Sequence, residues 1–460
     1  MTAKRVLVIG LDCAAPQLVF ERFRGELEHL PRLMEQGVWG ELQSVIPAIT
    51  VPAWACAMTS RDPGQLGIYG FRNRKDHSYE GLSMANSTAV HEPAVWDILS
   101  AAGKQVIVVA VPPAFPPKEV NGVMVGCFLT PDTNSDYTYP PTLRQEIAAV
   151  AGDYAVDVDD FRTDDKERIL KQIHDMTERR FKLFRHLLKT RRWDFAMMVE
   201  IGVDRMHHGF WQYFDERHHR YQSGNPYENT IRDYYKRVDQ EVGETLKQID
   251  DDTAVIIMSD HGAKLMHGGI RINEWLIREG YLTLKQPLAE AGPFKLDNVD
   301  WSKTKAWGEG GYYGRLFLNV RGREPEGIVP AENVASLRDE LATRLVAITD
   351  EQGNEIGTRV FKPEEIYREV RNVAPDLLVY FGDLNWRSVA TVGGEGIHTY
   401  ENDTGPDDAN HAQEGIAIIR APGLTASGQR DGMRLIDIGP TVLSLLGHGI
   451  PAEMIGTPLV

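Results

Sequence analysis

The sequence is poor in cysteine and contains no long hydrophobic run. Its 460 residues include only three cysteines. Their spacing fits neither a zinc ribbon nor a disulfide framework, so we expect buried thiols in a reducing compartment: Cys13, Cys56 and Cys127. No segment approaches the ~18 continuous apolar residues that cross a bilayer. The run Val6–Leu11 is too short for a signal-peptide core and is followed by Asp12. We therefore predict a cytoplasmic protein without a membrane span.

Positive charge is also scarce. The chain has 50 lysines and arginines against 66 aspartates and glutamates, which gives a formal net charge of −16. Proteins that bind nucleic-acid polymers usually carry a basic surface, so we expect no such polymer as a partner. The excess of acid is compatible with a small anionic substrate that is held through a metal ion.

Short apolar segments alternate with segments of helical pattern. The predicted strands are Val6–Leu11, Gly40–Val45, Gln105–Val111, Asp194–Val199, Thr253–Ser259, Leu316–Val320, Leu377–Phe381 and Gly415–Ile419. The predicted helices are Pro93–Ala102, Pro141–Val150, Lys166–Thr190, Tyr227–Ile249 and Asn333–Ala347. This alternation is typical of an α/β fold, with a mostly parallel sheet that helices cover on both faces. We expect a single α/β domain over residues 1–460.

Two stretches interrupt the alternation. Residues 112–160 are rich in Pro, Asp, Tyr and Thr, whereas residues 264–314 are rich in Gly and contain three tryptophans. Both follow predicted strands at the carboxyl edge of the sheet, where loops often form lids and pocket walls. We therefore predict that both stretches are insertions that cover or line a substrate site.

Three buried-type strands run into an acidic residue: Asp12, Asp204 and Asp260. The carboxyl ends of parallel strands share one edge of a sheet, where ligands bind in open α/β folds, so we expect these acids to converge. His261 adjoins Asp260, and His208 follows Asp204 by four residues, which is one turn of a helix. Carboxylate oxygens and imidazole nitrogens together are typical ligands of a divalent cation.

Thr50 is a candidate nucleophile. It follows the second predicted strand, and Pro52 is suited to the first turn of a helix that runs to about Ser60. Thr50 would then lie at or just before the helix N-terminus, where an anion is stabilised. A hydroxyl alone is a poor nucleophile, but coordination to a divalent cation lowers its pKa and activates it.

The order of these residues resembles the alkaline phosphatase superfamily, in particular its branch of type I phosphodiesterases and nucleotide pyrophosphatases. In that family an Asp is followed by a Thr or Ser nucleophile, Asp-x-x-x-His, Asp-His and a late His. The chain matches this order with Asp12, Thr50, Asp204, His208, Asp260, His261 and His411. The resemblance covers about residues 5–450. It implies an alkaline-phosphatase-like fold and a phosphohydrolase.

The resemblance also implies two divalent cations. Asp204, His208 and His411 would hold one ion, and Asp12, Thr50, Asp260 and His261 would hold the other. Thr50 would attack phosphorus and form a phosphothreonine, which water then hydrolyses. The mixed His and Asp ligands suit Zn²⁺ best, with Mn²⁺ as the alternative.

The residues that would contact the substrate depart from the family pattern. Nucleotide pyrophosphatases have an Asn shortly after the nucleophile helix, and Phe71 occupies that position here. Arg72 and Asn73 are neighbours that could take its role. Arg315 ends the glycine-rich stretch Gly310–Arg315 and is a further candidate contact. The pattern of the sulfatase branch is absent. At the position of the nucleophile the chain has neither the Cys nor the Ser of that branch, and the Arg that follows in the pattern is missing as well.

A phosphodiesterase for a small phosphoester is favoured over a monoesterase. A phosphomutase or phosphotransferase with the same nucleophile is an alternative, and a non-catalytic protein that binds a phospholigand is a second one. We expect His207 to have a packing role or to support His208. For His267 and Lys264, the sequence is compatible with a substrate contact and equally with a surface position. The sequence does not indicate how many subunits assemble.

Overall fold

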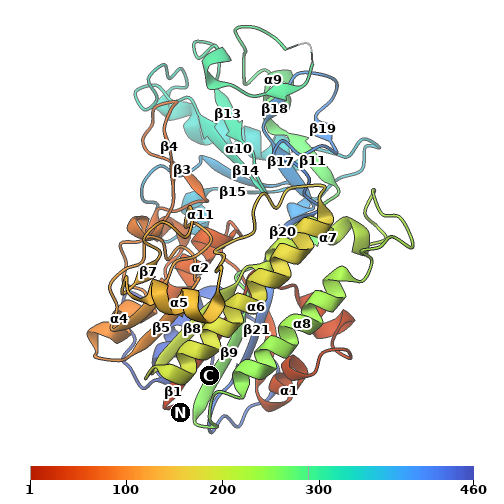
Figure 1. The fold of residues 1–460 in the computed structure, drawn as a ribbon. Helices are drawn as coiled ribbons and strands as arrows, with labels where there is room; N and C mark the ends of the chain where they lie inside the picture. Colours follow the sequence, from red (N-terminus) through yellow and green to blue (C-terminus); the bar gives the residue numbers. More distant parts are fainter. Residues whose placement is uncertain (1, 289) are drawn as a thin grey trace.

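The computed structural model describes residues 2–288 and 290–460, which form a large base and a smaller cap (Figure 1). The base contains one ten-stranded sheet in the order β22-β2-β21-β9-β1-β8-β5-β6-β7, and β23 also pairs with β2. Its strands are β1 (Arg5–Leu11), β2 (Val38–Gln43), β5 (Val106–Val109), β6 (Gly122–Val125), β7 (Thr138–Tyr139), β8 (Phe195–Glu200), β9 (Thr253–Met258), β21 (Glu414–Arg420), β22 (Gly428–Gln429) and β23 (Met433–Arg434).

β1 is central and sets the direction of the sheet. It pairs in parallel with β8 and with β9, so that Val8 lies opposite Met197 on one side and Ile256 on the other. β5 and β6 continue the parallel arrangement. Within this part of the described chain, only β21, which lies between β9 and β2, is antiparallel to both of its neighbours. The predicted, mostly parallel sheet is confirmed, and the carboxyl ends of β1, β8 and β9 share one edge.

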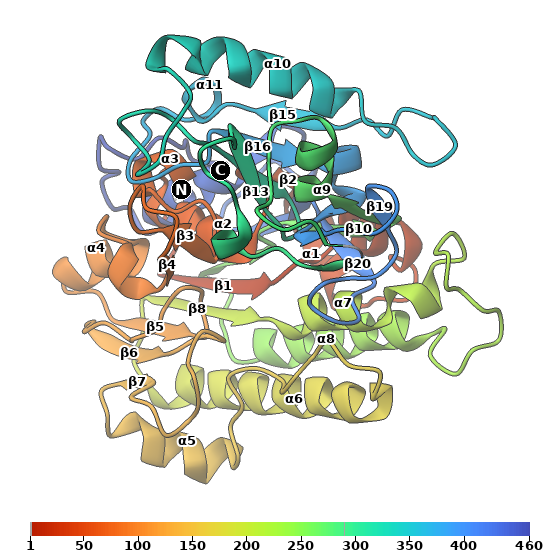
Figure 2. The same cartoon turned by 90° about the horizontal axis from the view of Figure 1, so that it is seen from above.

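Helices cover both faces of the sheet, as Figure 2 shows for α6 and α8 on one side of β1 and α2 on the other. The helices of the base are α1 (His29–Gln36), α2 (Thr50–Thr59), α3 (Pro63–Leu66), α4 (Val95–Ala101), α5 (Leu143–Ala151), α6 (Lys166–Thr190), α7 (Gly202–Phe214), α8 (Thr230–Leu246) and α12 (Ile438–Leu445). Helix α2 therefore begins at Thr50 itself, and Pro52 lies in its first turn.

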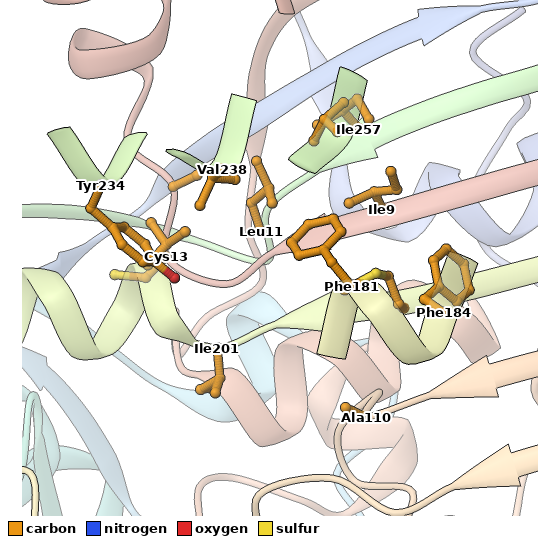
Figure 3. Close-up of a cluster of buried hydrophobic side chains, with 14 of the residues drawn as sticks. Ile9, Leu11, Cys13, Ala110, Phe181, Phe184, Ile201, Tyr234, Val238 and Ile257 are labelled. Carbon is orange, nitrogen blue, oxygen red and sulfur yellow. The ribbon is translucent and has the colours of Figure 1, made fainter. Parts of the chain in front are cut away.

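Side chains of β1 alternate between two hydrophobic cores. Ile9 and Leu11 pack with Phe181 and Phe184 of α6 and with Val238 of α8 (Figure 3). The intervening valines of β1 point to the opposite face, where α2, α4 and α12 cover them. Because residues of a strand project alternately to the two faces, a strand that is buried on both sides is apolar throughout. This explains why β1 appears in the sequence as a continuous apolar run.

The elements predicted from the sequence all form, with ends shifted by at most three residues, and α6 has the predicted bounds. Residues 112–160 pack on the base: β6 and β7 extend the base sheet, and α5 packs on α6. Val125 and Ile147 from this stretch belong to the same core as β1. The polar composition of the stretch reflects the loops between these short elements.

The cap is built from the chain between β10 and β20. It contains an antiparallel sheet in the order β13-β14-β16-β15, a sheet in the order β17-β11-β19 and a pair β12-β18. Its elements are β11 (Gly268–Arg271), α9 (Ile272–Arg278), β12 (Gly292–Pro293), β13 (Ala306–Glu309), β14 (Gly314–Leu318), α10 (Val334–Val346), β15 (Arg359–Phe361), α11 (Pro363–Ile366), β16 (Leu377–Tyr380), β17 (Trp386–Val389), β18 (Thr391–Val392) and β19 (His398–Thr399).

The cap has a hydrophobic core of its own, with Trp301, Trp307 and Phe317 near its centre. The predicted insertion 264–314 covers only the first part of this region. The predicted strands Leu316–Val320 and Leu377–Phe381 are β14 and β16 of the cap, so their expected place in the base sheet is corrected. A short apolar run fits either sheet, because burial on both faces looks the same in sequence.

The base and the cap are joined by a short antiparallel pair, β10 (Gly262–Leu265) and β20 (Ala409–Ala412). A hairpin, β3 (Arg72–Arg74) and β4 (Leu82–Met84), follows α3. Within residues 2–288 and 290–460, none of the helices combines the length and apolar character that a bilayer-spanning segment needs.

Candidate active site

The predicted metal-binding residues lie together at the carboxyl edge of the base sheet. Asp12 directly follows β1, Asp260 lies just beyond β9, and Asp204 stands in the first turn of α7, shortly after β8. His411 comes from β20, where the chain returns from the cap. These four side chains are buried. Strands that are distant in sequence thus bring their carboxyl ends to one point, as the parallel sheet requires.

Asp204, His208 and His411 form a first cluster of ligand atoms. His208 lies one helical turn after Asp204, and its Nε2 is 3.1 Å from Asp204 Oδ1. His411 Nε2 is 3.2 Å from His208 Nε2 and 3.8 Å from Asp204 Oδ1. One carboxylate and two imidazoles around a single point are a typical set for Zn²⁺.

The second cluster is centred on Nε2 of His261. Thr50 Oγ1 lies 3.3 Å from this nitrogen. Asp260 Oδ2 is 3.2 Å from it, and Asp12 Oδ1 is 3.9 Å from it. The candidate nucleophile therefore shares its surroundings with two carboxylates and an imidazole.

The two clusters adjoin each other. Asp12, Asp204 and His261 each offer a ligand atom, and these atoms lie within 4.8 Å of one another. The rings of His261 and His411 stack, with their centroids 3.9 Å apart. The two clusters are therefore neighbours, as the two cation sites of a two-metal centre are.

Each of the three histidines turns Nε2 toward the clusters, because its Nδ1 faces an oxygen atom elsewhere. The distances are 2.7 Å from His208 Nδ1 to Asp407 Oδ1, 3.2 Å from His261 Nδ1 to the Gly262 carbonyl and 3.0 Å from His411 Nδ1 to the Ala48 carbonyl. A hydrogen on Nδ1 that is donated to such an oxygen leaves the lone pair of Nε2 free to bind a metal.

Two carboxylate oxygens of the second cluster are poorly satisfied. Among the described residues, no group donates a hydrogen bond to Asp12 Oδ1 or Asp260 Oδ2, although both atoms are buried. Burial raises the pKa of both carboxyls well above its ordinary value, and neighbouring acids raise it further. A buried carboxylate without a partner is costly unless it coordinates a cation. These residues therefore fit a divalent cation.

In the first cluster, by contrast, the pKa of the acid is lowered. Burial opposes ionisation of Asp204, but the charge of His208 and its hydrogen bond hold the pKa of Asp204 well below its usual range. The pKa of His208 is raised to about 9, because Asp407 and Asp204 outweigh its burial. Burial lowers the pKa of His261 to about 4 and also lowers that of His411. The last two histidines are thus neutral at pH 7, whereas His208 would release its Nε2 proton on binding a metal.

A buried network anchors His208 from the cap side. Asp407 accepts from His208 Nδ1 at 2.7 Å, from Arg162 Nε at 3.1 Å and from the Tyr312 hydroxyl at 3.0 Å, and Arg387 Nη1 lies 3.6 Å away. Tyr312 also stacks on His208, with ring centroids 4.8 Å apart. Sequence reasoning missed these roles. The acidic pair that precedes His411 was the only signal for Asp407.

Two further contacts orient the second cluster. Trp54 Nε1 donates to Asp12 Oδ2 at 2.7 Å, and the backbone N–H of Cys13 donates to Asp260 Oδ1 at 3.2 Å. Cys13 adopts a positive φ of 66°, which is unusual for a residue with a side chain. The strained turn after β1 thus aims a backbone donor at the neighbouring carboxylate.

The first cluster, Asp204, His208 and His411, lines a cavity of about 710 Å³ between base and cap. Thr50, Arg72 and Arg315 line this cavity. Arg315 pairs with Glu309 at 2.6 Å and donates to the carbonyl of Arg72. Within the described chain, Asn73 does not line the cavity. The oxygen and the nitrogen of its side-chain amide are both hydrogen-bonded within the turn 69–73.

The three remaining candidates lie away from this cavity within the described ranges. His207 is buried with Nε2 3.1 Å from the Tyr235 hydroxyl, and burial lowers its pKa to about 3. Lys264 donates to the carbonyl of Asp383 at 2.7 Å. His267 is exposed and lines a separate hollow, which Lys264 also lines. These placements favour packing for His207 and structural contacts for Lys264.

A sequence profile described as type I phosphodiesterase / nucleotide pyrophosphatase matches residues 6–407. The chain belongs to this family. Members of this family are metal-dependent hydrolases that act on phosphoric ester bonds, in agreement with the resemblance seen in the sequence. The matched range includes both acids of the second cluster, and it ends four residues before His411.

Solved structures share the fold of this phosphodiesterase-family chain. Human ectonucleotide pyrophosphatase/phosphodiesterase 5 has a TM-score of 0.57 at 12% identity, over 98% of this chain and 97% of that chain. Phosphonoacetate hydrolase from Sinorhizobium meliloti 1021, solved with phosphonoformate, has a TM-score of 0.63 at 16% identity, over 97% of this chain and 96% of that chain. At such identities the likeness concerns the fold alone.

A curated relative shares only a part of the chain. GPI ethanolamine phosphate transferase 3 of Saccharomyces cerevisiae is 31% identical over 120 residues, which is 25% of this chain. The chain covers only 10% of that relative's length. The local similarity is therefore consistent with the family but does not extend to the whole transferase.

Proposed function

We propose that the protein cleaves a phosphodiester with Thr50 as the nucleophile and two divalent cations at the Asp and His clusters. The observation that carries this proposal is the position of Thr50 Oγ1. It lies at the first residue of α2, 3.3 Å from His261 Nε2, and faces the cavity. A helix N-terminus stabilises the negative charge of a phosphoryl group, so an attacking oxygen at this place meets its target where the anion is held.

The two clusters define the residues that would hold the cations. One ion would be bound by Asp204, His208 and His411, and the other by Asp12, Thr50, Asp260 and His261. When bound, the cations would lower the pKa of the Thr50 hydroxyl and neutralise charge on the phosphoryl oxygens. The ligand types suit Zn²⁺, with Mn²⁺ as the alternative.

The proposed reaction proceeds in two displacements at phosphorus. Thr50 Oγ1 forms a bond to phosphorus while the bond between phosphorus and the leaving alcohol oxygen breaks. The proton that the Thr50 hydroxyl loses balances the proton that the leaving alkoxide takes up. Water then replaces Thr50 on phosphorus, which restores the hydroxyl and releases a phosphomonoester.

The cavity favours a diester over a monoester. Its volume of about 710 Å³ is typical of sites for organic ligands, which span roughly 300–1,000 Å³. A phosphate group alone would fill a small part of this space, so there is room for organic groups on both ester oxygens. Arg72 also lines the cavity and can contact an anionic oxygen.

A phosphotransferase is the second candidate, because the local relative in yeast is a phosphate transferase. In that case an alcohol would replace water in the second displacement. Product analysis separates the two candidates. Reaction of one phosphodiester in ¹⁸O-water, with and without an added primary alcohol, yields labelled phosphomonoester for hydrolysis and a new unlabelled diester for transfer.

Substitution of Thr50 tests the nucleophile. Thr50→Ala should lower the hydrolysis of a methyl aryl phosphodiester by about 10³-fold or more, as expected for loss of a nucleophile, while both metals stay bound. Thr50→Ser is the matched control, because it keeps the hydroxyl and should retain much of the activity. Wild-type rates in a Thr50→Ala enzyme with full metal content would refute the assignment.

A further inference from the structure

The mouth of the active-site cavity carries exposed aliphatic side chains. Leu82 and Met84 of β4 are 42% and 50% exposed, and both line the cavity that begins at Thr50. They are two residues apart on a strand, so they project from the same face of the hairpin. Large exposed apolar side chains that gather at a cavity often mark a binding surface.

Further apolar side chains line the same cavity. Phe294 and Leu296 of the cap line the same cavity, and Phe71 and Phe128 of the base line it further in. These four side chains are only partly buried. Apolar side chains from the hairpin and from the cap thus line the same cavity as Thr50.

Among the five arginines that line the cavity in the described chain, one lies beside the exposed apolar side chains without an ion-pair partner. Arg72 lies directly opposite Met84 in the β3–β4 hairpin. Within the described ranges its guanidinium has no ion-pair partner, whereas Arg205, deeper in the cavity, is paired with Asp157 at 2.6 Å and with Asp204 at 2.5 Å. The mouth therefore combines one uncompensated positive charge with aliphatic surface, a pattern that is complementary to an amphiphilic anion.

We propose that the substrate of this site is a phosphodiester in which one ester group is a flexible aliphatic chain, lying between Leu82 and Met84 on one side and Phe294 and Leu296 on the other. This inference rests on the proposed function, since it places the scissile phosphorus at Thr50. Arg72, which lines the same cavity, contacts an anionic oxygen of this phosphate.

The chemistry of the walls favours an aliphatic chain over a nucleoside. A nucleobase has a polar edge that loses hydrogen bonds to water when it is buried, and the exposed side chains of Leu82 and Met84 offer it no donor or acceptor. An alkyl chain has no such requirement. Leu and Met are themselves flexible and adapt to chains of different length.

A binding series tests the aliphatic subsite without relying on catalysis. The probes are methyl esters of n-alkylphosphonic acids from ethyl to octyl, which are below their micellar concentration and carry a C–P bond in place of one ester bond. Binding to the metal-loaded protein is measured by calorimetry. Kd should fall by about two- to fourfold for each added methylene, because burial of a CH₂ contributes at most about a factor of four.

The double variant Leu82→Ser/Met84→Ser should bind the ethyl compound like the wild type and lose most of the dependence on chain length. Both side chains are exposed, so the substitutions leave the core intact. The matched control is Val346→Ser/Ile450→Ser, which removes two exposed aliphatic side chains, 48% and 38% exposed, that lie outside the cavity lining. The control should keep the wild-type slope.

Three results would overturn the inference: a wild-type Kd independent of chain length, an equal slope in the Leu82→Ser/Met84→Ser variant, or tighter binding of a nucleoside phosphonate than of the octyl probe. Hydrolysis of a methyl aryl phosphodiester is measured in parallel. A normal chain-length slope without hydrolysis would refute the proposed function and leave the subsite intact, whereas hydrolysis with a flat slope would refute the subsite alone.

Discussion

Replacement of Asp407 by Asn should weaken one of the two metal sites. The Asp407 carboxylate is buried, and it accepts from His208, Arg162 and Tyr312 at distances of 2.7 to 3.1 Å. Although burial opposes ionisation, His208 and the arginines hold the pKa of Asp407 well below its ordinary value, so it is charged at pH 7. An Asn side chain has nearly the same volume but no charge and only one accepting oxygen.

The expected loss follows from what Asp407 does for His208. Its bond to Nδ1 fixes the ring so that Nε2 points at Asp204 and His411. Partners of metal-binding histidines typically contribute 10- to 100-fold in metal affinity, which is about 1.4–2.7 kcal/mol. Competition of Zn²⁺ against a chromophoric chelator should show this loss for one of two bound ions per chain and little change for the other.

Asp408→Asn provides the matched control. Burial raises the pKa of Asp408 to about 7, and its contact with His208 is made by its backbone N–H, which the substitution keeps. Thermal melting of the metal-loaded variants checks that both are folded. If Asp407→Asn binds two Zn²⁺ ions with wild-type affinity, the anchoring role of Asp407 is wrong.

Three further predictions concern metal, stability and orientation. Chelation should abolish hydrolysis and added Zn²⁺ or Mn²⁺ should restore it; activity that is indifferent to both treatments would contradict the two clusters as metal sites. Trp54→Phe removes the N–H that holds Asp12 and should lower metal affinity by about tenfold, checked by the same chelator titration; an unchanged affinity would assign Trp54 to packing alone. Burial, with the nearby charge of His219, lowers the pKa of His218 to about 3. The unfolded chain therefore binds a proton below pH 6.5 that the folded protein does not, and stability falls with pH from about 6.5 to 3 by up to about 1.4 kcal/mol per unit. In urea titrations His218→Gln should show a shallower decline, and parallel curves would contradict the shift.

The base sheet and its catalytic edge could be predicted because their signals are local. β1, β8 and β9 are continuous apolar runs, and a parallel sheet brings the acids that follow such runs to one edge. Thr50 and Pro52 likewise predict where α2 begins. The division between base and cap could not be predicted, because β14 and β16 have the same apolar character as strands of the base.

The groups that support the clusters lie far apart in the sequence. Asp407 meets His208 across 199 residues, and Trp54 meets Asp12 across 42. No local pattern marks such pairs, since they depend on how the cap closes on the base and how α2 packs on β1. The apolar mouth has the same origin: Leu82 and Phe294 become neighbours of one cavity only in the folded chain.

The most direct test of the central claim is to trap the covalent intermediate. Metal-loaded protein is mixed with an aryl phosphodiester, quenched in acid within the first turnover, digested and analysed by mass spectrometry. We predict that the peptide with Thr50 gains one alkylphosphoryl group, and that the same peptide from Thr50→Ala gains none. A pre-steady-state burst of the aryl alcohol with the label on another residue, or with no labelled residue, would contradict the account.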